Sequence, residues 1–148
     1  MSRNPPGASE RPSPAAVKSI SAIIGVLFIG VLFQAVSSGI FVREQHHDGL
    51  INAHSGIAYL VGLLALAALV VAVVMWRGRA GGQVVVAETA ALFIAVVIQI
   101  GIGQQVGDLG KTGTHPGLLA VHIPLALIIF GLAVHISAYV ASIRRGAR

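Results

Sequence analysis

Residues 49–76, GLINAHSGIAYLVGLLALAALVVAVVMW, contain no Asp, Glu, Lys or Arg. An α-helix needs ~20 predominantly apolar residues to cross the hydrocarbon core of a bilayer. This stretch is therefore predicted to form a membrane-spanning helix. Asp48, directly before it, can cap the N-terminus of that helix, because a carboxylate there accepts hydrogen bonds from unpaired backbone N–H groups.

Three further stretches lack these charged residues and are also long enough to span. They lie between Lys18 and Arg43, between Glu88 and Asp108, and between Lys111 and Arg144. We therefore expect an all-α protein with spans at about residues 15–42, 49–76, 84–106 and 116–143. Residues 1–12 are rich in Pro, Ser and Arg and are predicted to be a disordered cytoplasmic tail, which leaves 13–148 as one transmembrane domain. The sequence has no evident internal repeat.

The overall composition supports the membrane class. Hydrophobic residues make up 55% of the chain and charged residues only 10%, against about 25% charged in soluble domains. The net charge is +5, but no basic helix is interleaved with aromatic residues, which argues against nucleic acid as a partner. The chain has no cysteine, so disulfides, thiolate zinc sites, iron–sulfur clusters and covalent c-type haem attachment are excluded.

The distribution of basic residues predicts the orientation. Four spans place two basic residues, Arg43 and Lys111, on one side of the membrane and the others on the opposite side: Arg3, Arg11, Lys18, Arg77, Arg79, Arg144, Arg145 and Arg148. Cytoplasmic segments carry the excess of Lys and Arg. We therefore expect both termini in the cytoplasm, with the protein in the inner membrane as an up-down four-helix bundle.

Two histidines are predicted to lie inside helices at matching depth. His54 is the sixth residue if the second helix starts after Asp48, and His122 is the seventh if the fourth starts at Pro116. At ~1.5 Å per residue, each lies roughly 9 Å along a helix that begins on the outer side. Polar side chains within a membrane are costly and usually mark a site.

Two imidazoles at one level on different helices can ligate a haem iron from opposite faces. Bundle cores hold such cofactors, and the sequence therefore favours one haem b bound by His54 and His122. Two alternatives stay open. The histidines can be structural residues that hydrogen-bond between helices, or they can serve another metal or a proton path.

Other polar residues are assigned roles around this site. Arg43 and Lys111 are either anchors for the haem propionates or ordinary loop charges. Gln104, like Gln34, Gln99 and Gln105, is expected to hydrogen-bond between helices, with a propionate or quinone contact as the alternative. The remaining outer histidines are interpreted as solvated loop residues or as a second metal or haem site: His46, His47 and His115.

Two polar residues lie on the other side of the bundle. His135 is 13 residues past His122, roughly 20 Å deeper, and is expected at a helix contact or among the lipid headgroups. Glu88 is expected to be a boundary residue near the start of the third helix, where the positive dipole end favours a carboxylate.

The chain resembles one four-helix half of haem A synthase. The resemblance rests on INAHSGIAYLVGLLALAAL (51–69), IQIGIGQQVG (98–107) and HPGLLAVHIPLAL (115–127), and it covers nearly all four helices. Small bacterial four-helix membrane proteins of unassigned function share the pattern. It implies that His54 and His122 are a haem-ligand pair. The family's substrate half has a glutamate where this chain has Ile51, so the likeness is to the cofactor-holding half.

These patterns favour a b-type haem-binding membrane protein that acts in electron transfer or haem handling. The resemblance implies that it works with a second copy or within a larger respiratory complex. The first alternative is a haem-free structural subunit of a larger membrane complex. The second is a haem A synthase-like oxidase, so whether the chain is an enzyme stays open.

Overall fold

The computed structural model describes residues 13–43, 48–76, 82–109 and 116–146, and these residues form four long helices. They are α1 (Pro14–Arg43), α2 (Asp48–Trp76), α3 (Gly82–Leu109) and α4 (Pro116–Gly146). Each helix encloses a span expected from the sequence and is long and apolar enough to cross a membrane. The expected tail at residues 1–12 lies outside the described residues.

The first helix begins with a serine followed by a proline, Ser13 and Pro14. Ser13 Oγ accepts a hydrogen bond from the Ala16 N–H at 3.2 Å, and the Ser13 carbonyl accepts one from Val17 at 3.2 Å. Ser13 is therefore the N-cap. Pro14 occupies the first helical position, where the missing N–H of proline removes no hydrogen bond.

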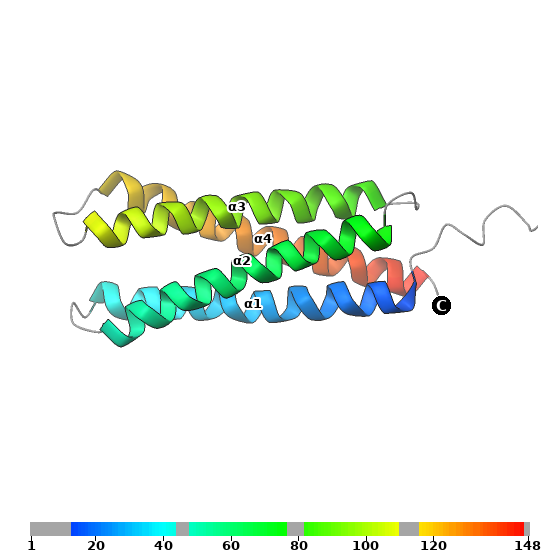
Figure 1. Ribbon diagram of the computed structural model, residues 1–148, viewed down its shortest axis with the longest axis horizontal. Helices are drawn as coiled ribbons and strands as arrows, with labels where there is room; N and C mark the ends of the chain where they lie inside the picture. The colour runs from blue at the N-terminus through cyan, green and yellow to red at the C-terminus, as the bar shows by residue number, and fades with distance from the viewer. Residues whose placement is uncertain (1–12, 44–47, 77–81, 110–115, 147–148) are drawn as a thin grey trace, which may run out of the picture.

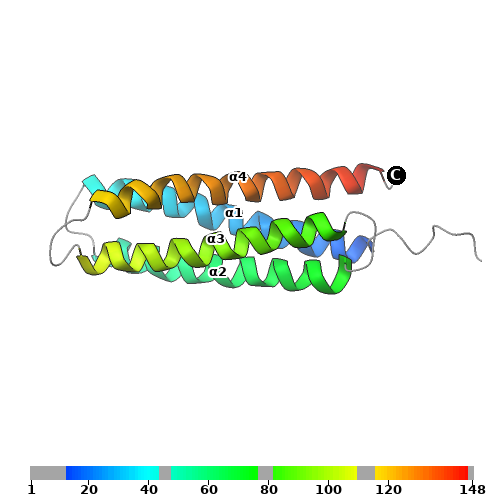
Figure 2. The ribbon, with the colours of Figure 1, turned by 90° about the horizontal axis from the view of Figure 1, so that it is seen from above.

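The helices are arranged side by side in a closed ring. In both views successive helices run in opposite directions, and the start of α1 lies at the same end as the end of α4 (Figures 1 and 2). In the described part of the chain α1 packs on α2, α2 on α3, α3 on α4, and α4 back on α1. The aromatic side chains of Phe28 in α1 and Phe130 in α4 contact each other where α4 packs on α1, with their centroids 4.9 Å apart.

The buried apolar side chains occupy one half of this bundle. On every helix they extend from the end that carries the start of α1 to about the middle, and the outermost of them are Leu27, Val61, Val96 and Ile129. Among the described residues closer to the opposite end, only Ser37 is fully buried. We call the first part the core half and the opposite part the histidine end, because His54 and His122 lie there.

The two helical hairpins, α1–α2 and α3–α4, repeat the same register. Within α2 and α4, a histidine is followed by buried residues at intervals of seven, four, three and four: His54, Val61, Ala65, Ala68 and Ala72 in α2, and His122, Ile129, Ala133, Ile136 and Val140 in α4. Within α1 and α3, three buried residues precede a glutamine, and the intervals between the four positions are the same in both helices. They are Ile20, Ile24, Leu27 and Gln34 in α1, and Val85, Thr89, Leu92 and Gln99 in α3. The two hairpins therefore share a register of burial, although their sequences show no evident internal repeat.

A close approach of α1 and α2 gives a test of the packing. A Cβ added at Gly30 would lie 2.7 Å from Val61 Cγ2, whereas nothing lies within 4 Å of one added at Gly25. Gly30→Ala is therefore expected to destabilise the bundle by about 1–3 kcal/mol, the usual cost of overpacking. Thermal unfolding in detergent, followed by circular dichroism, measures the effect. Gly25→Ala is the matched control, and equal melting of the two variants would contradict the close contact.

Candidate functional site

His54 and His122 lie at equivalent positions of the two hairpins. Each is the seventh residue of its helix, counted from Asp48 in α2 and from Pro116 in α4. Each also lies seven residues, nearly two full turns, before the first fully buried apolar residue of its helix, so both are on core-facing sides. The two imidazoles are partly buried and close enough to interact electrostatically.

Matching hydrogen bonds hold the two histidine backbones. Gln34 Nε2 of α1 donates to the His54 carbonyl of α2 at 2.6 Å, and Gln99 Nε2 of α3 donates to the His122 carbonyl of α4 at 3.0 Å. Each bond joins the two helices of one hairpin at the level of its histidine. The expectation of interhelical bonding is thus confirmed for both glutamines, and their acceptors are the backbones of the two histidines.

Ser37 is a hydrogen-bond partner of the His54 ring. Ser37 Oγ lies 3.2 Å from the Gln34 carbonyl, to which it can donate, and 2.9 Å from His54 Nδ1. When the hydroxyl proton is on that carbonyl, the hydroxyl oxygen accepts from His54 Nδ1–H. The ring lone pair is then on Nε2, the form in which a histidine ligates a metal while its other nitrogen is held by a hydrogen bond.

Removing this hydroxyl should weaken ligation through His54 and leave the fold intact. A lost hydrogen bond to a ligating histidine typically costs about 10–100-fold in affinity, so we expect Ser37→Ala to lower haem affinity by about that factor. Haem titration of the purified apoprotein, followed by absorbance, measures it. Ser38→Ala is the matched control, because the Ser38 hydroxyl donates to the Ala35 carbonyl of its own helix and has no bond to another helix among the described residues. Equal affinities of the two variants would refute the role of Ser37.

The ring of His122 is positioned by packing. A Cβ at Gly103 of α3 would lie 3.1 Å from His122 Cε1, so α3 approaches the imidazole closely only because this residue is a glycine. His122 Nδ1 is buried, and in the described part of the chain it has no hydrogen-bond partner. The equal scaffolds of the two hairpins thus end in unequal ring environments, a hydroxyl beside His54 and a glycine beside His122.

The surroundings of the two histidines fit a haem. The buried apolar core stops two helical turns short of both rings, and an apolar macrocycle between the hairpins would extend it. No described group of three or more His, Cys, Asp or Glu side chains lies close enough to hold a metal ion. Two histidines alone suffice for haem iron, since the porphyrin supplies the other four ligands.

Among the other polar residues predicted near the site, the structure describes the side chains of Gln104 and Gln105, and the remaining side chains are outside the described part. Gln104 donates to the Tyr59 hydroxyl of α2, which confirms an interhelical bond, and its side chain is exposed. Gln105 Nε2 donates to the Gly101 carbonyl of its own helix at 3.5 Å, and its expected interhelical role stays a prediction. The side chain of Arg43 lies outside the described structure, as do the following residues: Lys111, His46, His47 and His115.

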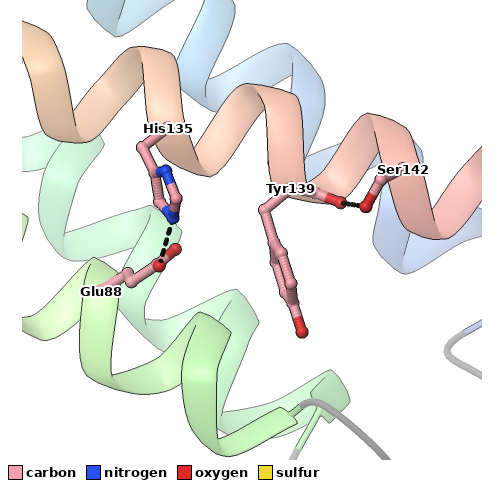
Figure 3. A network of polar contacts seen from close by, with 4 residues as sticks. All are labelled: Glu88, His135, Tyr139 and Ser142. Atoms are coloured by element: carbon pink, nitrogen blue, oxygen red, sulfur yellow. Dashed lines mark hydrogen bonds and ion pairs between the residues drawn. The ribbon is translucent and has the colours of Figure 1, made fainter.

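One polar contact was missed by the sequence reasoning. His135 Nε2 of α4 lies 2.9 Å from Glu88 Oε1 of α3 (Figure 3). His135 therefore makes a helix contact, which is one of the two roles expected for it. Glu88 is a partner in an interhelical ion pair in addition to being near the start of its helix. Only the rotation of the two helices about their axes brings these side chains together, and no sequence pattern encodes that rotation.

Comparisons with known proteins add no relative. No family model, no curated protein and no solved structure matches the chain. The structure therefore defines the class of protein. The described residues form four helices that can span a membrane, and the chain is an all-α, multi-pass membrane protein.

Proposed function

We propose that the chain is a b-type haem-binding membrane protein in which His54 and His122 hold one haem b, and that it serves in electron transfer or haem handling. The proposed topology is an up-down bundle in the inner membrane with both termini cytoplasmic. This places the histidine end near the outer face, in keeping with the excess of Lys and Arg on the other side.

One observation carries the proposal. Two histidines occupy the same position in the repeated register of the two hairpins, on core-facing sides, just beyond the end of the apolar core. A polar side chain in that setting costs free energy unless a partner or ligand satisfies it. A structural role would need a hydrogen-bond partner for each ring, yet His122 Nδ1 is buried with none among the described residues.

Each residue of the site has a defined task in this proposal. His54 and His122 would hold the haem iron, one from each hairpin. Gln34 and Gln99 fix the backbones that carry them, and Ser37 keeps the proton of His54 on Nδ1. A bound haem would supply reversible one-electron chemistry, while the protein sets orientation and excludes water. Arg43 and Lys111 are proposed as partners of the propionates, which favour the aqueous edge of the bundle.

Optical spectroscopy tests the proposal directly. The protein is purified in detergent from cells supplied with haem, and a reduced-minus-oxidised spectrum is recorded. Low-spin bands with two histidine ligands are expected, and extraction into alkaline pyridine should identify haem b. A protein that is folded and free of haem bands would refute haem binding and favour the haem-free structural subunit. Haem that turns over a substrate would instead support the oxidase.

A further inference from the structure

Glu88 and His135 form a second polar site, far from the haem ligands. Figure 3 shows the two side chains pointing toward each other from α3 and α4, with His135 Nε2 at 2.9 Å from Glu88 Oε1. Glu88 lies six residues after Gly82, the first residue of α3, which is about 9 Å along the helix. Both residues fall within segments that can span a membrane, in the core half of the bundle.

The pair is not part of the repeated scaffold. The position equivalent to Glu88 in the first hairpin is Ile23, and the position equivalent to His135 is Ala67, as the register of buried residues shows. Among the described residues of the first hairpin, no side-chain hydrogen bond or ion pair joins α1 to α2 at this level, since the hydrogen bonds between these two helices lie at the histidine end. Helix packing alone therefore does not require the pair, and a carboxylate in an apolar bundle is costly to keep.

The two carboxylate oxygens have different surroundings. Oε1 is paired with His135, whereas Oε2 is buried and has no hydrogen-bond partner among the described residues. The glutamate side chain is 18% exposed and the imidazole 64%. The carboxylate is thus held inside the bundle, and the imidazole connects it to the outside of the bundle.

The 2.9 Å contact lets the two groups share one proton. One proton on the pair gives a net charge of zero, either as carboxylate with imidazolium or as carboxylic acid with imidazole. Without that proton the pair carries a net negative charge inside the membrane, which is costly.

We propose that Glu88 and His135 form a proton-binding site within the membrane. Proton uptake transfers one H⁺ from water to the imidazole or the carboxylate, and movement between Nε2 and Oε1 passes along their hydrogen bond without electron transfer. This proposal does not depend on haem binding.

Few other titratable groups lie in this half among the described residues. The further titratable groups described in this half are Lys18 on α1 and Tyr139, Arg144 and Arg145 on α4, and the described part of α2 in this half has none. None of them is hydrogen-bonded or ion-paired to Glu88 or His135 in the described structure. Tyr139 lies one turn beyond His135 and extends toward α3 in Figure 3, which makes it the group closest to the pair along α4.

Infrared difference spectroscopy tests the site on the full chain in lipid nanodiscs. Spectra are compared between about pH 5 and pH 8, the range in which imidazole changes charge. We expect a carboxylic acid C=O band that shifts in D₂O, changes together with histidine ring bands, and is lost in Glu88→Gln. In His135→Gln the carboxyl band should remain but change its pH dependence, which keeps the test usable if Glu88→Gln folds poorly.

A His122→Gln control separates this site from the haem site, because the band should persist in that variant. If wild type and Glu88→Gln give the same pH-difference spectrum, the pair is a fixed link between α3 and α4 and the proposal is wrong. The proposal is equally wrong if the carboxyl band of His135→Gln follows pH as in wild type, since the two groups then take up protons independently.

Discussion

Replacing His54 or His122 by glycine is expected to abolish the low-spin haem spectrum of the purified protein. Each substitution would remove one proposed haem ligand and leave the hairpin register intact, because neither side chain belongs to the buried apolar core. Added imidazole should restore the spectrum, since a free ring can enter the space that the side chain leaves. The measurement is the reduced-minus-oxidised absorbance per mole of protein, with and without imidazole.

His135→Gly is the matched control for this experiment. It removes a histidine from the same helix as His122, but one that pairs with Glu88 in the core half, so its haem content should equal that of wild type. Rescue by imidazole distinguishes a lost ligand from a lost fold. Full haem spectra in both the His54 and His122 variants would eliminate the proposed ligation.

Gly103→Val should displace the His122 ring and lower haem affinity without removing a ligand. A Cβ at this position would already lie 3.1 Å from His122 Cε1, and the added methyl groups increase the crowding. Overpacking of this kind costs about 1–3 kcal/mol, which corresponds to a loss of affinity of about 5–150-fold. Haem titration of the apoprotein gives the value directly.

Gly101→Val serves as the control, because nothing lies within 4 Å of a Cβ added there. The two glycines are two residues apart on α3, so the change in helix propensity is the same for both variants. The result expected is weaker haem binding for Gly103→Val alone. A similar loss in both would attribute the effect to the helix and not to contact with the ring.

The four helices could be predicted from the sequence, because hydropathy over about 20 residues depends on composition alone. The equal depth of His54 and His122 also followed from counting residues along two helices. The repeat of the hairpins did not, because positions with the same burial carry different residues, such as Ala68 in α2 and Ile136 in α4. Only the pattern of burial reveals that they are equivalent.

The surroundings of the histidines were harder to predict than the histidines themselves. Ser37 is a small polar residue in an apolar run, and such a residue commonly bonds to its own helix. Its contact with His54 depends on how α1 and α2 are rotated about their axes. The same rotation determines that Glu88 meets His135, whereas the sequence only placed each of them near a helix end or a helix contact.

The repeated hairpins have a consequence for how the protein can be modified. Anything bound between them is presented with the same backbone and the same glutamine-to-carbonyl link on each of its two faces. The difference between the faces then resides in a few residues outside the apolar core, chiefly Ser37 beside one histidine and Gly103 beside the other. A single substitution at one of these positions alters the surroundings of one histidine only. The electronic properties of a bound centre can therefore change while the fold stays the same.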